Sequence, residues 1–70
     1  GYRIVNADCL IMIERPKMRD YILQMKQNIC DTLDIDINQL NIKATRGEKI
    51  GFVGREEGVM AQAVVLMERK

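Results

Sequence analysis

The stretch from Ile4 to Glu14 limits the fold of this 70-residue chain more than any other feature of the sequence. It reads IVNADCLIMIE and is rich in β-branched residues. The alternate positions from Ala7 to Ile13 are apolar, and Leu10 and Met12 make the opposite face apolar as well. A short apolar run of this kind, followed closely by Pro16, predicts a strand that is covered on both faces.

A helix is predicted after this strand, over residues 18–33. Pro16 suits the first turn of a helix, because its missing N–H would be unpaired there in any case. The end of the helix is poorly marked, since Asp31 and Asp34 oppose the helix dipole and no glycine is present to cap it. The predicted apolar stripe, at steps of four and three residues, consists of Met18, Ile22, Met25, Ile29 and Leu33, with Tyr21 and Cys30 widening it.

Two further strands are predicted in the second half of the chain. Residues 40–45 alternate between apolar and polar side chains, which is typical of a strand with one polar face. Residues 46–58 contain four glycines and no sustained period, which predicts a loop with at most a short helical turn. Residues 60–67 are apolar at both parities except at Gln62, and predict a third strand buried on both faces. A terminal helix over residues 56–69 is the alternative.

The predicted order of elements indicates an α+β fold with βαββ topology. A helical crossover makes the first two strands parallel, so the connections that follow them, residues 15–19 and 46–55, meet at one edge of the sheet. Ligands of open α/β sheets bind in this position. One helix covers only one face of the sheet, so we expect either an oligomer or a fragment, with a partner subunit or a further segment on the other face.

Positive charge is concentrated on the same two connections. Residues 15–19 carry three cations and no acid, and residues 43–55 carry four cations against Glu48, although the net charge of the whole chain is only +1. Glycines let backbone N–H groups approach an anion closely, and a lone acid can hold a divalent cation that bridges phosphate oxygens. The pattern therefore favours an anion site, with an ordinary surface loop of turn glycines as the alternative.

The composition excludes several classes of function. The chain has no histidine, so no Ser-His, Cys-His or His-zinc site can form within it. Cys9 and Cys30 have no CxxC spacing and lie in apolar segments, which predicts reduced, buried thiols and a cytoplasmic setting. The sequence predicts no signal peptide and no membrane span. Net charge near zero and three non-alternating aromatic residues argue against nucleic acid as a partner.

Several short strings also carry a resemblance to a known family. They are GY at residues 1–2, N-x-D at 6–8, PKM at 16–18, NIKAT at 41–45, EK at 48–49 and GFVGREEG at 51–58. These strings resemble the C-terminal half of 2-C-methyl-D-erythritol 2,4-cyclodiphosphate synthases, whose usual run is NVKATTTEKLGFTGRGEG. The likeness covers essentially the whole chain without a gap.

The resemblance implies that residues 1–70 are the C-terminal half of a single synthase domain of non-mevalonate isoprenoid biosynthesis. Such an enzyme, a phosphorus-oxygen lyase, converts 4-diphosphocytidyl-2-C-methyl-D-erythritol 2-phosphate to the 2,4-cyclodiphosphate and releases CMP. The resemblance further implies a cytoplasmic (or, in a eukaryote, plastid-type) homotrimer with active sites between subunits. Magnesium or manganese would bind the diphosphate, and zinc would be held by ligands in the N-terminal half. These seventy residues alone should not catalyse the reaction.

The resemblance also implies roles for individual residues. Glu48 would reach the magnesium or manganese ion, and Arg46 stands at the position of a family threonine that stabilises the transition state. Phe52 and Arg55 would border the substrate and a cavity along the trimer axis, where isoprenoid diphosphates are inferred to sit. The expected substrate-binding residues are Ile13, Pro16, Lys17, Met18 and Arg19 on the cytidine side, and Ala44, Thr45, Gly47 and Glu48 on the diphosphate side. A stand-alone or degenerate oligomeric module that binds an anionic nucleotide without catalysis is the alternative.

Overall fold

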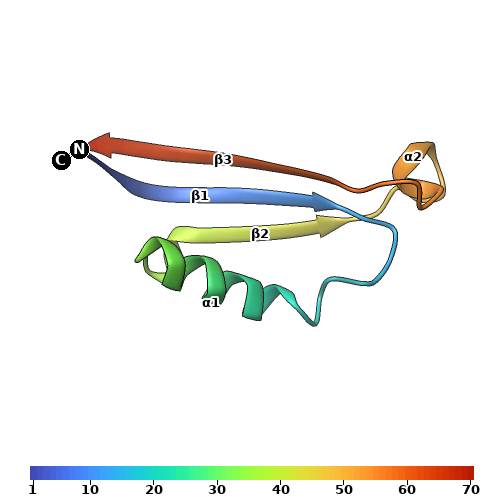
Figure 1. The fold of residues 1–70 in the computed structure, drawn as a ribbon, viewed down its shortest axis with the longest axis horizontal. Coiled ribbons are helices and arrows are strands. Elements are labelled where there is room, and N and C mark those ends of the chain that lie inside the picture. Colours follow the sequence, from blue (N-terminus) through green and yellow to red (C-terminus); the bar gives the residue numbers. More distant parts are fainter.

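A three-stranded mixed sheet with one long helix on one side forms the chain, as seen in a computed structural model that describes all 70 residues (Figure 1). The sheet order is β2-β1-β3. The elements are β1 (Tyr2–Met12), α1 (Ile22–Leu33), the 3₁₀ helix η1 (Ile37–Gln39), β2 (Leu40–Thr45), α2 (Gly51–Gly54) and β3 (Met60–Arg69). The predicted α+β fold with βαββ order is confirmed. The alternative of a terminal helix is wrong, because residues 60–69 pair with β1 as a strand.

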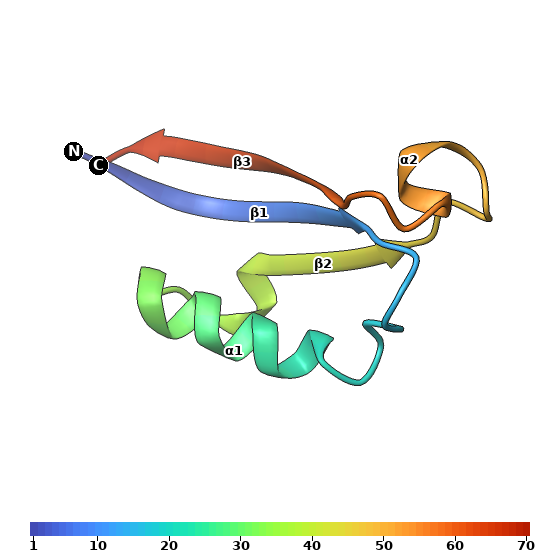
Figure 2. The same ribbon diagram turned by 45° about the vertical axis from the view of Figure 1, so that its right-hand side comes forward.

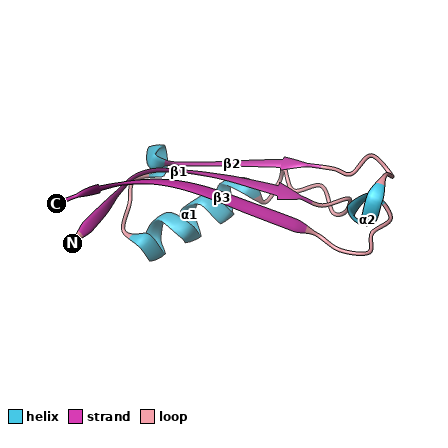
Figure 3. Ribbon diagram, turned by 90° about the horizontal axis from the view of Figure 1, so that it is seen from above, coloured by secondary structure: helices cyan, strands magenta, loops and turns pink.

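The central strand β1 sets the register of both neighbours. It pairs in parallel with β2 from Ala7 opposite Leu40 to Met12 opposite Thr45. It pairs antiparallel with β3 along its whole length, with one register shift between Ile4 and Asn6. The parallel pairing brings the carboxyl ends of β1 and β2 together, as the helical crossover predicts. Figure 3 shows α2 beyond this end of the sheet and both chain termini at the opposite end.

The core lies between α1 and the face formed by β1 and β2 (Figures 1 and 2). Its buried members are Ala7, Cys30, Leu40 and Ile42, and partly buried side chains pack around them, including Met25 and Ile29 of the predicted stripe. Both cysteines are free thiols, with Cys30 buried and Cys9 half-buried. Neither helix is long and apolar enough to cross a membrane.

The helix starts later than predicted and ends at the predicted residue, Leu33. It begins at Ile22 rather than at residue 18, and Pro16 lies in the irregular connection before it, so the assignment of Pro16 to the first turn is wrong. The helix is capped at Asp34, which takes the left-handed conformation with φ 55° and donates its N–H to the carbonyl oxygen of Cys30. Aspartate tolerates this conformation better than most residues, so no glycine is needed. Leu33, predicted to be part of the stripe, is largely exposed.

The third strand is exposed on both faces in this chain. Every residue of β3 is exposed, including Val64, Val65, Leu66 and Met67. The sequence predicts that this strand is buried on both faces, but the 70 residues do not bury it. The reason is that α1 packs over β1 and β2 and leaves β3 uncovered.

Truncation of Leu40 tests the position of the core. Leu40 is 3% exposed, so Leu40→Ala should lower the free energy of unfolding by about 2–5 kcal/mol through lost burial and a residual cavity. Leu23 on α1 is 62% exposed, and Leu23→Ala should change it by no more than about 0.5 kcal/mol. Urea unfolding of the two variants checks this. Equal losses would show that the helix presents a different face to the sheet.

Candidate functional site

One backbone–backbone hydrogen bond and one hydrogen bond from a backbone N–H to a side chain join the segments at the ends of β1 and β2. The N–H of Ile13 donates to the carbonyl oxygen of Thr45 at 3.0 Å, which extends the parallel pairing past the end of the strands. The N–H of Gly47 donates to Oε1 of Glu14 at 3.1 Å. The prediction that these two segments meet at one edge of the sheet is thereby confirmed.

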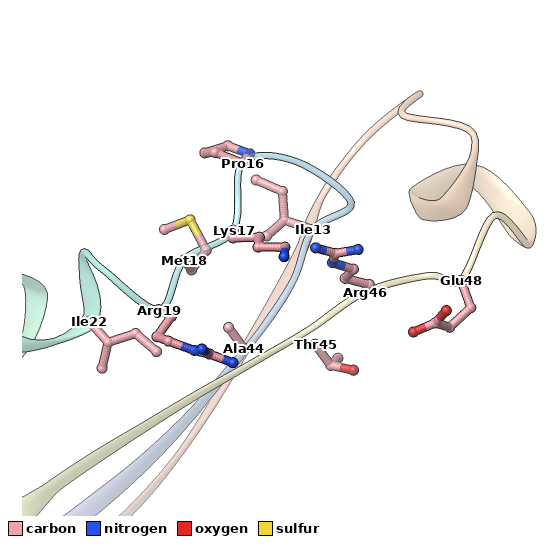
Figure 4. A pocket seen from close by; sticks show the side chains of 10 residues that line it. All are labelled: Ile13, Pro16, Lys17, Met18, Arg19, Ile22, Ala44, Thr45, Arg46 and Glu48. Carbon is pink, nitrogen blue, oxygen red and sulfur yellow. The ribbon is translucent and has the colours of Figure 1, made fainter.

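A cavity of about 530 Å³ lies where these segments meet (Figure 4). Part of its wall is apolar and comes from the first connection, the start of α1 and the end of β2. The rest is polar, so the cavity has the mixed lining that small-molecule sites commonly show. Its lining residues are Ile13, Pro16, Lys17, Met18, Arg19, Ile22, Ala44, Thr45, Arg46 and Glu48.

The side chains at the end of β2 divide between two sides of the chain. Figure 4 shows Ala44 and Arg46 on the side of Lys17, with the Arg46 guanidinium directed toward the Lys17 end of the cavity. Thr45 and Glu48 point to the other side. For Ala44, Thr45 and Arg46 this division follows from the alternation of side chains along a strand. Glu48 lies beyond the end of β2, and its direction is set by the turn, in which it has a positive φ of 53°. The division places the cationic groups and the single carboxylate on different sides of a ligand that would lie against the end of β2.

The cations of the cavity have no carboxylate partner. Arg15 pairs with Glu56, Arg55 with Glu57 at 2.6 Å, and Lys43 with Asp8 at 3.7 Å, all outside this cavity. Lys17, Arg19 and Arg46 form no ion pair, although all three are exposed at the cavity wall. Like charges gathered without counter-charges repel one another, and an anion bound among them relieves that repulsion.

Close contact between two glycines shapes the loop that carries Glu48. A Cβ on Gly47 would lie 2.4 Å from the backbone nitrogen of Gly54, and a Cβ on Gly54 would lie 2.4 Å from the carbonyl carbon of Lys49. Glu48 and Lys49 themselves have positive φ values of 53° and 62°. The two glycines therefore allow the turn in which Glu48 is presented at the mouth of the cavity.

A second cavity, of about 400 Å³, adjoins the first and shares Pro16, Lys17 and Arg46 with it. No large apolar side chain lines it. The two cavities differ in kind, because the first has several apolar side chains in its wall and the second is lined by charged side chains together with Pro16 and Gly54.

Most of the residues singled out in the sequence surround the first cavity. The exceptions are Gly47, Phe52 and Arg55, which do not line it. Gly47 bonds to Glu14, and Arg55 pairs with Glu57 beside α2, so the expected roles of Phe52 and Arg55 at the substrate stay predictions. Ile22 was missed as a lining residue, because its position in the apolar stripe assigned it to the core alone. Its place at the first turn of the helix was the available signal.

The metal-binding capacity of the chain is limited to isolated carboxylates. No three His, Cys, Asp or Glu side chains come close enough to hold a metal ion together. A zinc site does not fit these residues. Glu48 does fit a magnesium site, since magnesium is often held by one carboxylate together with phosphate oxygens of the ligand and water.

Comparison with known proteins places the chain in a family. The model of the YgbB family matches residues 1–68. The chain belongs to the YgbB family. The resemblance drawn from its sequence strings is confirmed by curated relatives named 2-C-methyl-D-erythritol 2,4-cyclodiphosphate synthase. The protein of a Geobacillus species is 53% identical over all 70 residues, and that of Chlorobaculum parvum is 50% identical over the same length. The chain spans only 44% and 45% of these two relatives.

Solved structures of this family share the fold. The cyclodiphosphate synthase of Plasmodium vivax has a TM-score of 0.96 and 30% identity, with 99% of this chain and 46% of that one covered. The bifunctional IspDF of Campylobacter jejuni has a TM-score of 0.93 and 40% identity, with 96% of this chain and 18% of that one covered. IspF of Plasmodium falciparum, solved as a CDP complex, has a TM-score of 0.91 and 29% identity, with 94% and 42% covered.

Adding a methyl group at Gly47 tests the glycine contact in this YgbB-family chain. Gly47→Ala places a Cβ against backbone that cannot rotate away, and should lower stability by about 1–3 kcal/mol, as overpacking does. Gly58→Ala is the matched control, because its Cβ would meet only the Phe52 ring, at 3.2 Å, and should cause a smaller loss. Thermal unfolding compares the two. A stable Gly47→Ala variant would contradict the close approach of residues 47 and 54.

Proposed function

We propose that this chain supplies the nucleotide- and diphosphate-binding half of a cyclodiphosphate synthase, as the C-terminal half of the synthase domain. The whole protein would convert 4-diphosphocytidyl-2-C-methyl-D-erythritol 2-phosphate to 2-C-methyl-D-erythritol 2,4-cyclodiphosphate and CMP. The observation that carries the proposal is the first cavity, in which apolar walls and unpaired cations come together at the carboxyl ends of two parallel strands. The CDP complex of the Plasmodium falciparum relative supports a cytidine nucleotide as the ligand.

The lining of the cavity suits a nucleotide in two parts. Ile13, Met18 and Ile22 supply the apolar surface against which a base and ribose can pack. Lys17 and Arg19 supply ammonium and guanidinium donors for phosphate oxygens, and charge-assisted hydrogen bonds of this type are among the strongest in proteins. The nucleoside is thereby oriented so that its diphosphate lies toward Thr45 and the loop of Glu48.

The reaction needs charge placement more than protein nucleophiles. The 2-phosphate of the substrate attacks a phosphorus of the diphosphate, one phosphorus–oxygen bond forms, another breaks, and CMP leaves with the electrons of the broken bond. Because negative charge spreads over the transferring oxygens, fixed positive donors stabilise the transition state more than the ground state. Lys17, Arg19 and Arg46 line the first cavity, and in this proposal they would hold the CMP-side phosphate and orient it for departure.

One residue of the chain would bind a metal ion. Glu48 would hold magnesium or manganese, which would neutralise charge on the diphosphate when bound. Zinc has no ligand set among these residues, so the share of the reaction assigned to this chain is nucleotide binding and diphosphate orientation.

An oligomeric arrangement, with a homotrimer as the expected form, belongs to the same proposal. Apolar side chains are exposed along β3 at Val64, Val65, Leu66 and Met67, and an uncovered strand of this kind invites pairing or packing with another surface. Sedimentation equilibrium of the protein that carries this chain should give three times the protomer mass at micromolar concentration. A monomer at that concentration would contradict the trimer.

A second candidate function is nucleotide binding without turnover. The observation that favours it is Arg46, which stands where the family run has threonine and changes both the length and the charge of the side chain at that position. Measured release of CMP from the substrate separates the two candidates, because both predict binding and only the first predicts product.

Two substitutions test the proposed nucleotide site. Lys17→Ala and Glu48→Ala, in the protein that carries this chain, should each weaken CDP binding in the presence of magnesium by about tenfold, the effect of losing roughly one charge-assisted contact. Isothermal titration calorimetry measures the affinity. Lys26→Ala and Asp31→Ala on α1 are the matched controls, since neither residue lines either of the two cavities described above or forms an ion pair. Unchanged affinity in both cavity variants would remove the site.

A further inference from the structure

Three consecutive residues, 13–15, tie the end of β1 to the segments that follow β2. The first two do so through the hydrogen bonds to Thr45 and Gly47 described above. The third, Arg15, reaches Glu56 beyond α2, 41 residues further along the chain. The last of these links therefore joins two connections that neither a strand nor a helix holds together.

The contact between Arg15 and Glu56 is a two-point ion pair. The guanidinium reaches both carboxylate oxygens, from Nε to Oε1 and from Nη2 to Oε2 at 3.2 Å. Two contacts from one planar group fix the orientation of the partners as well as their separation. The side chains are 78% and 44% exposed, and ion pairs at such positions stabilise a fold only slightly. The pair therefore affects the position of the two segments more than the stability of the whole chain.

Glu56 forms this pair from an unfavourable backbone conformation. Its φ is 61°, in the left-handed region that glycine adopts without cost and glutamate does not. In the family run quoted above, NVKATTTEKLGFTGRGEG, glycine stands at this position. A carboxylate is thus present where the backbone favours a residue without a side chain, and its contact with Arg15 offsets part of the conformational cost.

The wall of the first cavity begins immediately after Arg15. Residues 16–19 all line that cavity. No backbone hydrogen bond joins residues 16–20 to the sheet, and none of them forms an ion pair. Arg15 is therefore the last residue that a polar contact holds to the second half of the chain before this wall. Lys17, whose side chain lines both cavities, follows it by two residues.

We propose that Arg15 and Glu56 are positioning residues of the nucleotide site, whose ion pair holds residues 16–19 at the wall of the first cavity. The inference rests on the proposed nucleotide function and adds two residues outside the cavity on which the affinity depends. Neither of them lines the first cavity, so both act through the wall that Lys17 and Met18 form there.

Two substitutions that remove opposite charges test this positioning role. If the two side chains acted on the nucleotide only through their charges, Arg15→Gln should weaken CDP binding and Glu56→Gln should strengthen it. If their ion pair positions the wall, both substitutions should weaken CDP binding by about three- to fivefold, the upper range for an exposed ion pair. Isothermal titration calorimetry with CDP and magnesium, on the full protein that carries this chain, measures the affinities.

A charge exchange and a remote ion pair complete the experiment. Arg15→Glu combined with Glu56→Arg restores an ion pair of opposite polarity and should recover most of the affinity that either single variant loses. Arg3→Gln and Glu68→Gln are the matched controls, because they remove the same charges from an exposed pair, joined at 2.7 Å, at the opposite end of the sheet. Both controls should leave the affinity unchanged. Circular dichroism and thermal unfolding confirm that each variant is folded.

The outcomes separate this inference from the function on which it rests. Unchanged or stronger CDP binding by Glu56→Gln, a charge-exchanged variant no tighter than Arg15→Gln, or an equal loss in Arg3→Gln would overturn the positioning role and leave nucleotide binding in the first cavity standing. Failure of the unsubstituted protein to bind CDP with magnesium would instead overturn the proposed function. Weaker binding by both single variants, with recovery in the exchanged variant, supports the positioning role.

Discussion

The parallel pairing of β1 with β2 is the constraint on which the rest of the structure depends. Six residue pairs, from Ala7 with Leu40 to Met12 with Thr45, fix the relative position of the two strands. The hydrogen bond from Ile13 to Thr45 carries this order into the connections that follow. A slip of one residue in β1 would turn Ala7 and Cys9 away from α1 and would remove the contribution of β1 to the core. The position of the cavity is therefore set by the same register that buries the core.

Close contact between backbone atoms shapes the loop that follows β2 at this edge of the sheet. Gly47 and Gly54 approach so tightly that neither has room for a Cβ, and Gly47 is also tied to Glu14 near the start of the first connection. The side chain of Val53 in the same loop is buried, at 3% exposed. Backbone contacts, the Glu14 carboxylate and this one apolar side chain therefore position the loop, while Arg46 and Lys49 form no ion pair and remain available to a ligand.

Much of this arrangement could be predicted from the sequence, because hydrophobic periodicity and chain order determine which strand ends meet. The three strands, a helix between the first two and the meeting of the connections that follow β1 and β2 all follow from that order. The start of the helix could not be predicted, since Met18 fits the helical period but lies in the connection that crosses from the sheet edge to α1. The end at Leu33 agrees with the prediction, although the cap at Asp34 could not be foreseen, because aspartate at a left-handed position gives no glycine signal. The pairing of Arg15 with Glu56 joins residues 41 apart in the sequence, and only the folded loops show that it leaves Lys49 and Arg46 unpaired.

The exposed third strand and the electrostatically unbalanced cavity are both unfavourable in free energy for this chain. β3 presents apolar side chains to solvent on both faces, and the carboxyl edge presents three cations, Lys17, Arg19 and Arg46, that form no ion pair. Each is a free-energy deficit that the 70 residues do not resolve among themselves, and each is relieved by contact with a complementary surface: apolar for the strand and anionic for the edge. Because β1 joins β3 on one side and leads directly into the cationic connection at Ile13, a surface that orders β3 also orders one wall of the cavity. Coverage of the sheet and occupation of the anion site should therefore stabilise one another.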